Sequence, residues 1–509
     1  MRWSISGGHS FSMDNTMKHR RVLVPALLLC LVVSVAAAPD TSERLSEQIE
    51  AVLQKHQLGR AFFGAKVVWL KNGQVLYARN SSSYFMPASN MKLVTAVAAA
   101  EILGLDYRFE TILGTNGRIV DASLEGDLVI VGSGDPTIGA RLNSPDWEKV
   151  EEGDPFVIFG QWSEQLKSRG IKRVTGDLVA DASVFTGPER GAGWAWDDFA
   201  WGYCAPVSGL QFNENTALLR IPPPAAPVFA PAVELIPSGA LRLVNLLSYA
   251  GKEDQPQVDA TVVAPGVIEL TGKARTDRTS LYSLAVSAPP EYFLAMLKQA
   301  LTQSGITVDG GTRVIPESTA VPQSSQSLFT FDSPDLRTVL KIMLKVSQNL
   351  YAETLLKVLS PARKGKTFED GRDQVRQFLC GIGVPEDGFV VADGSGLSRY
   401  NLLTPDTLVT LLEHAYRASY GPDLVGFLPV GGVDGTLRQR MQASAATANA
   451  RAKTGTLMYV RCLSGYIDTR DGERLAFSLM LNHAPRQLME KPESVLDEIA
   501  ALLAEYRRE

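Results

Sequence analysis

A serine and a lysine three positions apart, Ser89 and Lys92, are the first residues of this sequence that could perform covalent chemistry. Positions i and i+3 of a helix share a face, so the two side chains can touch. A lysine removed from water loses part of its preference for the charged form, and its neutral amine can accept the proton of a serine hydroxyl. A chain of this length contains roughly two Ser-x-x-Lys matches by chance. The pair alone is therefore weak evidence for a nucleophile and its base.

Two further motifs follow in the order that a known group of serine hydrolases requires, Ser347-Gln348-Asn349 and Lys453-Thr454-Gly455-Thr456. Lys-Thr-Gly is expected only about 0.1 times by chance in such a chain. Ser347 and Asn349 could be surface polar residues of a helix, but they interrupt an apolar segment, where buried polar groups need partners. A cleft supplies such partners, so the three motifs together predict an active site.

The three motifs resemble those of the penicillin-recognising serine hydrolases, specifically the class C low-molecular-mass penicillin-binding proteins, the D-alanyl-D-alanine carboxypeptidase/endopeptidase family. The long separation of Ser89 from Ser347 is also similar to this family, in which two extra domains interrupt a transpeptidase-like domain. Further segments that carry the resemblance are Gly132–Thr137, Gly191–Asp198, Ala392–Arg399 and Gly432–Leu437.

The resemblance implies a role for each motif residue. Ser89 would attack the carbonyl of the penultimate D-alanine with Lys92 as its base, and water would later free the acylated peptide. Ser347 would pass a proton to the leaving amine, and Lys453 would add positive charge to the cleft. Backbone N–H groups of Ser89 and Thr456 would bind the oxyanion, a contribution of about 10²–10³ in rate for each donor.

Substrate binding is assigned by the same resemblance. Asn349 would hold the peptide through its amide, and Thr454 and Thr456, which flank Gly455, would hold the terminal carboxylate. A separate pocket for the free end of a diaminopimelate side chain would use Arg399, an aspartate of the insertion, and a residue just past Lys-Thr-Gly. The candidates for the last two positions are Asp181, chosen by eye, and Leu457 or Met458. On glycine content alone the segment 393–399 would be a plain glycine-rich turn, but the resemblance shifts the balance toward the pocket.

Other conspicuous residues are expected to be structural. We interpret Asp135 as a turn former before Pro136, and Trp194 and Trp196 as packing aromatics. The three cysteines beyond the leader predict no disulfide framework, and we expect them to be buried like hydrophobic residues; they are Cys204, Cys380 and Cys462. No histidine has a second His or Cys at ligand spacing, so no metal site and no cofactor are expected.

The elements around the motifs predict an α+β fold. Helical spacing covers 41–56, 86–104, 289–304, 333–358, 368–381 and 492–506, and apolar runs that favour strands cover 65–70, 75–78, 456–467 and 475–481. Residues 107–320 form short β-like runs broken by Gly, Pro, Asn and Asp, which favours a β-rich insertion over a parallel βαβ domain. We therefore expect a β-lactamase/transpeptidase-like domain, an antiparallel sheet flanked by helices, made of residues 38–108 and 333–509. Residues 109–332 would form two inserted domains.

The charge of the chain and its first residues bear on which partners and which location are expected. The 509 residues carry 50 Lys and Arg against 55 Asp and Glu, a formal charge of -5 that gives no basic footprint for nucleic acid. Residues 1–37 have the pattern of a signal peptide, with a basic stretch after Met17, an apolar run and small residues before Ala38, and the true start could be Met17. The apolar run is short for a membrane span, so export to the periplasm without an integral anchor is expected.

Two rival functions share parts of this evidence. A β-lactamase or esterase would use the same nucleophile, but no clear candidate exists for the glutamate loop that deacylates class A β-lactamases. A non-catalytic scaffold that binds the cell wall would be expected to lose at least one of the reactive residues, and none is lost. The expected partners are therefore peptidoglycan stem peptides ending in D-Ala-D-Ala, with diaminopimelate, and β-lactams as covalent inhibitors.

Overall fold

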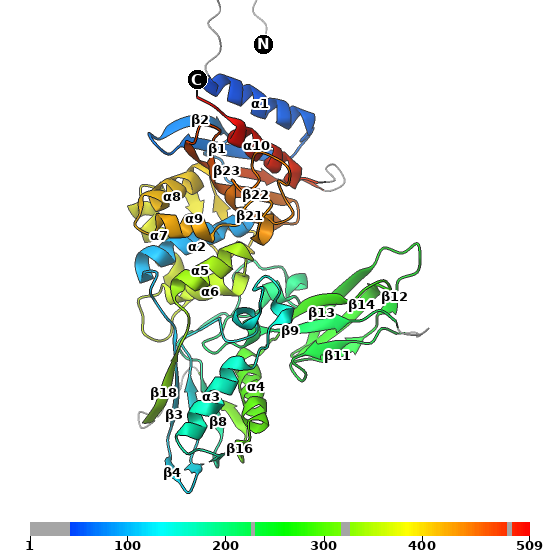
Figure 1. The fold of residues 1–509 in the computed structure, drawn as a ribbon, viewed down its shortest axis with the longest axis vertical. Coiled ribbons are helices and arrows are strands. Elements are labelled where there is room, and N and C mark those ends of the chain that lie inside the picture. The colour runs from blue at the N-terminus through cyan, green and yellow to red at the C-terminus, as the bar shows by residue number, and fades with distance from the viewer. Residues whose placement is uncertain (1–40, 225–229, 317–325, 486–490, 509) are drawn as a thin grey trace, which may run out of the picture. The chain divides into compact units, whose positions relative to one another are not determined.

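The computed structural model describes residues 41–224, 230–316, 326–485 and 491–508 (Figure 1). The predicted signal peptide, residues 1–37, lies outside the described residues. Within the described part of the chain, none of the helices combines the length and the apolar character needed to cross a bilayer.

Two distant parts of the chain form one five-stranded antiparallel sheet, as predicted. Its strand order is β2-β1-β23-β22-β21, and β1 pairs with β23 along its whole length. Both predicted hairpins are present, because Asn-Gly and Asp-Gly supply the turns between the paired apolar runs. The strands are β1 (Phe62–Trp69), β2 (Gln74–Arg79), β21 (Arg451–Leu457), β22 (Val460–Asp468) and β23 (Arg474–Asn482).

Helices cover both faces of this sheet (Figure 1). The amphipathic helices α1 (Thr41–Lys55) and α10 (Glu493–Glu505) pack together, and α10 contacts β22. The apolar, Ala-rich helix α2 is buried on the other side, where it contacts its neighbouring helices. These are α5 (Leu336–Lys345), α6 (Asn349–Val358), α7 (Phe368–Gly381) and α8 (Pro405–Arg417), with α2 spanning Met91–Leu103, and α9 (Gly421–Phe427) packs against α5 and α8. A two-stranded sheet of β19 (Phe389–Val390) and β20 (Leu402–Leu403) completes this part.

The helix predicted over 333–358 is two helices. Ser347 has φ 62°, the left-handed region that a non-glycine residue seldom adopts, and it separates α5 from α6. The break starts α6 at Asn349, with the Gln348 side chain accepting a hydrogen bond from the Leu350 N–H as the N-cap. The helical spacing of apolar residues continues through Ser347, so the sequence pattern did not reveal the break between α5 and α6.

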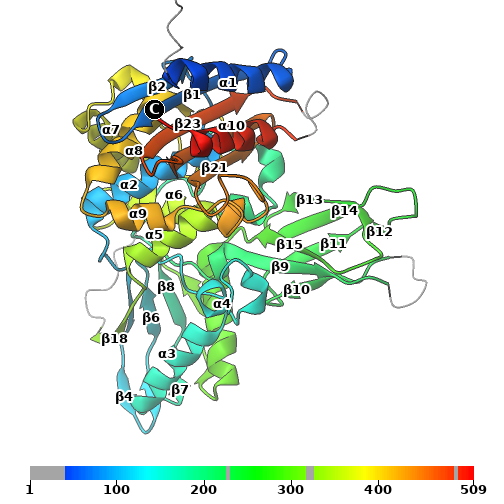
Figure 2. The same ribbon diagram turned by 45° about the horizontal axis from the view of Figure 1, so that its top comes forward.

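The prediction of a β-rich insertion without a parallel βαβ unit is wrong for its first part. Helix α3 (Val157–Ser168) connects β6 to the parallel strand β8, and α4 (Pro289–Gln303) packs against β8 and β17 (Figure 2). The apolar runs β6 and β8 are those of a parallel sheet buried on both faces. The strands are β3 (Glu110–Thr115), β4 (Arg118–Val120), β5 (Ser123–Glu125), β6 (Leu128–Val131), β7 (Arg173–Val174), β8 (Leu178–Asp181), β16 (Thr307–Val308), β17 (Thr312–Val314) and β18 (Gln326–Asp332).

The second part of the insertion is built from strands, with its own hydrophobic core. One sheet has the order β10-β9-β15, and the other centres on β14. Its strands are β9 (Thr216–Ile221), β10 (Glu234–Ile236), β11 (Arg242–Asn245), β12 (Ser248–Tyr249), β13 (Gln257–Ala264), β14 (Val267–Ala274) and β15 (Ser280–Ala285). The division of the chain at 108/109 and 332/333 stays a prediction.

The prediction of three buried cysteines is wrong for one of them. Cys204 and Cys462 are buried, but Cys380 is exposed. Cys380 lies in the last turn of the amphipathic helix α7, on the side away from its buried residues.

Candidate active site

The predicted nucleophile and base are in contact. Ser89 lies in a 3₁₀ turn (Ala88–Asn90) immediately before α2, and Lys92 lies in the first turn of that helix. Lys92 Nζ is 2.9 Å from Ser89 Oγ and 2.8 Å from the carbonyl oxygen of Ser395. Burial lowers the pKa of Lys92 to about 7, although the carboxylates of Asp393 and Glu353 oppose the shift. A neutral amine beside the hydroxyl is therefore well populated near neutral pH.

The second motif reaches the same place from α6. Asn349 Oδ1 accepts a hydrogen bond from Lys92 Nζ over 2.6 Å, and Asn349 Nδ2 donates to the carbonyl oxygen of Tyr203 in the insertion. Ser347 Oγ accepts from Lys453 Nζ over 2.9 Å. All three motifs thus converge on one cluster of hydrogen-bonding groups.

The third motif lies within β21 and packs against the turn that carries Ser89. A Cβ on Gly455 would lie 2.6 Å from the carbonyl oxygen of Pro87, so only glycine allows this approach. Burial and the nearby Lys92 hold the pKa of Lys453 well below its ordinary value. This weakens the positive charge that we expected Lys453 to contribute.

The motif residues open into a cavity of about 870 Å³. Ser89, Ser347, Asn349, Thr454 and Thr456 all line it. Thr454 Oγ1 donates to Thr436 Oγ1 over 2.8 Å. Other lining residues of the cavity include Gly193, Asp197, Asp198, Tyr203, Arg399, Thr436, Leu457, Met458, Arg440, Arg461 and Glu493.

Three of the four residues predicted for a side-chain pocket come together. Arg399, Leu457 and Met458 line the cavity, and Arg399 Nη1 donates to the Met458 carbonyl oxygen over 3.3 Å. Asp181 does not lie among the lining residues. It is buried at the end of β8, where its carboxylate pairs with Lys364 at 3.1 Å. The choice of Asp181 is therefore corrected: the aspartates that the insertion brings to this cavity are Asp197 and Asp198.

The glycine-rich segment 393–399 is held by buried carboxylates. Glu353 accepts hydrogen bonds from the N–H groups of Gly394 and Ser395, the latter over 2.7 Å. Asp393 accepts from Trp194 Nε1 over 2.8 Å. Burial, followed by the charge of Asp393, raises the pKa of Glu353. These contacts fix the Ser395 carbonyl that Lys92 contacts, so this segment is more than a surface turn.

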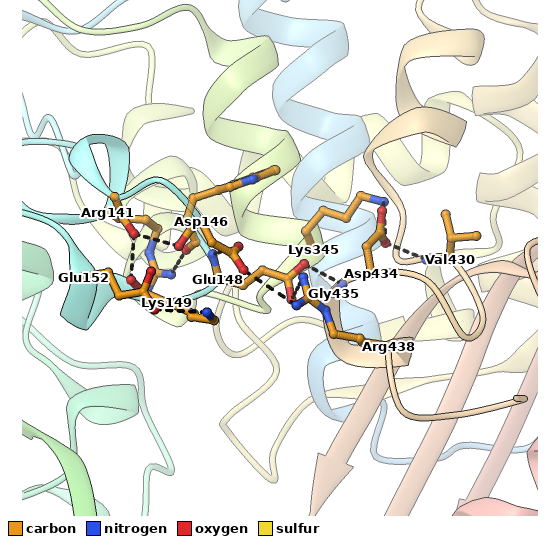
Figure 3. A network of polar contacts seen from close by, with 12 residues as sticks. Arg141, Asp146, Glu148, Lys149, Glu152, Lys345, Val430, Asp434, Gly435 and Arg438 are labelled. Atoms are coloured by element: carbon orange, nitrogen blue, oxygen red, sulfur yellow. Dashed lines mark hydrogen bonds and ion pairs between the residues drawn. The ribbon is translucent and has the colours of Figure 1, made fainter.

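A polar network joins the insertion to the loop that follows α9 (Figure 3). Glu148 Oε1 accepts from the Gly435 N–H over 2.8 Å, and Glu148 Oε2 pairs with Arg438 at 3.0 Å. Lys345, at the end of α5, binds Asp434 through both carboxylate oxygens. Gly435 directly precedes Thr436, the partner of Thr454, so the network supports the hydroxyl pair in the cavity.

Comparison with known proteins decides the family. The model of the D-Ala-D-Ala carboxypeptidase 3 (S13) family matches residues 45–505. The chain belongs to this family. Because the match begins in α1 and ends in α10, the S13 family covers the five-stranded sheet, its helices and the insertion together.

Individual relatives are similar to this chain over most of its length. A D-alanyl-D-alanine carboxypeptidase of Actinomadura sp. is 33% identical, over 95% of this chain and 90% of its own length. D-alanyl-D-alanine carboxypeptidase DacB of Haemophilus influenzae is 29% identical, over 81% of this chain and 84% of its own. The crystal structure of penicillin binding protein 4 from H. influenzae has a TM-score of 0.76 at 27% identity, covering 89% of this chain and 97% of that chain. The predicted family and fold class are confirmed.

Several residues that line the active-site cavity were missed by the sequence analysis. Tyr203, Arg440, Arg461 and Glu493 line the cavity but belong to none of the three motifs. Only Arg461 had a usable signal, since it lies a few residues past Lys-Thr-Gly across a short turn. Of the residues expected to be structural, Asp135 does bind its own turn through the Thr137 N–H, and Trp194 is buried. Trp196 is 75% exposed, so its predicted packing role is wrong.

Proposed function

We propose that this chain is a serine-type D-Ala-D-Ala carboxypeptidase that cleaves peptidoglycan stem peptides through an acyl-enzyme. One observation carries the proposal: in a member of the S13 family, Lys92 Nζ lies 2.9 Å from Ser89 Oγ with its pKa lowered to about 7. This distance is within reach for proton transfer. The relatives from Actinomadura and H. influenzae are named for the same activity.

In the first step, Ser89 Oγ attacks the carbonyl carbon of the penultimate D-alanine. Its proton passes to the neutral amine of Lys92, and the carbonyl π electrons move onto the oxygen. The N–H groups of Ser89 and Thr456 stabilise that oxyanion. The support for this assignment is that both residues line one cavity and that Gly455 lets β21 approach the Ser89 turn.

In the second step, the oxyanion reforms the carbonyl and the bond to the terminal D-alanine breaks. The leaving nitrogen takes a proton from Ser347 Oγ, which regains one from Lys453, its partner at 2.9 Å. Water then attacks the acyl-enzyme: its hydroxyl stays on the freed peptide, its proton restores Lys453, and Lys92 returns to Ser89 Oγ the proton that it took in the first step. Asn349 holds the peptide through its amide, while Thr454 and Thr456 bind the terminal carboxylate.

The cavity also suits a stem peptide with a charged side chain. Arg399 can pair with a carboxylate, and Asp197 or Asp198 can pair with an amine, so both ends of a free diaminopimelate side chain have a partner beside Leu457 and Met458. Diaminopimelate peptides are therefore the proposed substrate class. Cleavage of cross-linked peptides, the endopeptidase reaction, uses the same acyl step and is proposed as a second activity.

We also propose the inhibitor, the cellular location and the domain bounds of this enzyme. A β-lactam would acylate Ser89, as the structure of the H. influenzae protein complexed with a β-lactam suggests by analogy. We place the mature protein in the periplasm, delivered by a signal peptide at residues 1–37. The catalytic domain would comprise residues 38–108 and 333–509, and residues 109–332 would form the inserted domains.

Release of D-alanine from a diaminopimelate pentapeptide tests this function. Wild-type enzyme should release one D-alanine per peptide, and Ser89→Ala should release none above background. Benzylpenicillin should block the wild-type reaction in proportion to the enzyme acylated. Release by Ser89→Ala at the wild-type rate would refute the proposal, as would absence of release by the wild-type enzyme.

A further inference from the structure

An arginine lies directly beside the predicted carboxylate site. Arg461 on β22 pairs with Thr456 on β21 in the antiparallel register. Side chains of directly opposed residues share one face of a sheet, with Cβ atoms about 4.5–5.5 Å apart. Arg461 also lines the cavity that contains Ser89 and Thr454. The backbone register therefore brings a guanidinium next to the threonine pair.

The guanidinium is held firmly on one side. Nη1 donates to the carbonyl oxygens of Leu457 and Val460, over 3.0 Å and 2.8 Å, across the tight turn between β21 and β22. Nε contacts Glu493 at 3.3 Å. Nη2 makes no hydrogen bond to the residues that the structure describes. A guanidinium has five N–H groups, so donors remain for a ligand.

The charge of Arg461 matters because the two cleft lysines lose theirs readily. Burial lowers the pKa of both Lys92 and Lys453, and the charge of Lys92 lowers that of Lys453 further. An arginine keeps its charge under these conditions. The side chain of its acidic neighbour Glu493 is 36% exposed and has one polar partner among the described residues, so it screens the charge of Arg461 incompletely. By contrast, Arg440, which also lines the cavity, is bound by three hydrogen bonds to Asp497.

We propose that Arg461 binds the carboxylate on the leaving-group side of the scissile bond. In a D-Ala-D-Ala peptide this is the terminal carboxylate, and in a penicillin it is the carboxylate of the five-membered ring. Arg461 is thus a binding residue that selects carboxylate-terminated substrates, beyond what the Lys-Thr-Gly-Thr motif supplies. The inference rests on the proposed function, because it assumes acylation at Ser89.

The test compares two acylating agents that differ in one group. Second-order acylation rates are measured for benzylpenicillin and for benzylpenicillin methyl ester, with wild-type enzyme, Arg461→Gln and Arg461→Lys. Arg461→Gln should slow the free acid about 10- to 100-fold, the range of a lost charge-assisted hydrogen bond, and slow the ester less than about threefold. Arg461→Lys keeps the positive charge but loses the two-pronged guanidinium, so its acylation rate with the free acid should lie between those of wild type and Arg461→Gln.

The ratio of the two rates separates binding from folding. Loss of the bonds to Leu457 and Val460 loosens the turn and would slow both agents equally. Arg474→Gln, which removes an arginine paired with Asp468 on the same sheet, should leave the ratio at its wild-type value. An unchanged acid-to-ester ratio in Arg461→Gln refutes the inference while acylation by wild-type enzyme still supports the function. Failure of both agents to acylate the wild-type enzyme refutes the proposed function itself, and the inference with it.

Discussion

Asn349 Oδ1 lies 2.6 Å from Lys92 Nζ, so a side chain of α6 fixes the amine that faces the nucleophile. A neutral amine has two N–H groups and one lone pair. Lys92 has three oxygen neighbours, and two of them, Asn349 Oδ1 and the Ser395 carbonyl, can only accept. The lone pair is then directed to the third, Ser89 Oγ, which carries a proton. The second motif thus orients the base of the first.

The pH dependence of acylation should follow the protonation of Lys92. The pKa of Lys92 is lowered to about 7, and only the neutral amine can accept the Ser89 proton. The rate should therefore be level above about pH 8 and fall about tenfold per pH unit well below pH 7. Stopped-flow acylation by a chromogenic cephalosporin between pH 5 and 9 measures this. A rate that rises as the pH falls would contradict the role of Lys92 as base.

Glu353 should be essential for stability through its two backbone partners. Glu353→Ala leaves the buried N–H groups of Gly394 and Ser395 without an acceptor, at a cost of about 2–4 kcal/mol in the free energy of unfolding. Glu353→Gln keeps one acceptor, and we expect it to lose less than about 1.5 kcal/mol. Urea unfolding at pH 7 compares them. Equal stability of both variants and wild type would remove Glu353 from the support of the Ser395 carbonyl.

Gly455 should tolerate no side chain. In Gly455→Ala the new Cβ meets the Pro87 carbonyl oxygen, so the Ser89 turn or β21 must move. We expect a loss of about 1–3 kcal/mol in stability and at least a tenfold slower acylation. Gly160→Ala is the matched control, because its Cβ meets nothing within 4 Å on helix α3, and it should be neutral or stabilising. Full activity of Gly455→Ala would show that the close approach is not required.

Arg399 should govern the choice of substrate more than the chemistry. Arg399→Ala should lower kcat/KM for peptides with a free diaminopimelate end by about 1.5–3 kcal/mol, the range for a charge-assisted hydrogen bond. Acylation by benzylpenicillin, which lacks that side chain, should change little. Equal losses for peptide and benzylpenicillin would instead indicate a general defect of the cleft and return 393–399 to a structural turn.

The motif residues and the main sheet were predictable because they depend on local spacing. The hairpin turns, α2 and the amphipathic ends α1 and α10 follow from patterns within a few residues. The break at Ser347 was not predictable, because the hydrophobic spacing continues from α5 into α6 and a serine seldom adopts the left-handed region. The same applies to the parallel pairing of β6 and β8, which joins strands on either side of a helix.

Site residues whose positions are set by strand register or by contacts distant in sequence could not be predicted from the sequence. Asp181 was chosen by eye, but it is buried at the end of β8 and pairs with Lys364, which lies far away in sequence. Arg461 lies only a few residues past Lys-Thr-Gly in the sequence, but its place opposite Thr456 follows from the β21–β22 register. Motifs therefore located the reacting groups, while the surrounding binding residues required the fold.

The central claim, that Ser89 is the acylated nucleophile, is tested most directly by intact-protein mass spectrometry after exposure to benzylpenicillin. Wild-type enzyme should gain the mass of one whole penicillin molecule, because ring opening releases no leaving group, and peptide mapping should locate it on Ser89. Ser89→Ala should gain none, while its melting temperature stays close to that of wild type, since Ser89 lines a cavity and not a packed layer. An adduct on another residue, or full acylation of Ser89→Ala, would contradict the account.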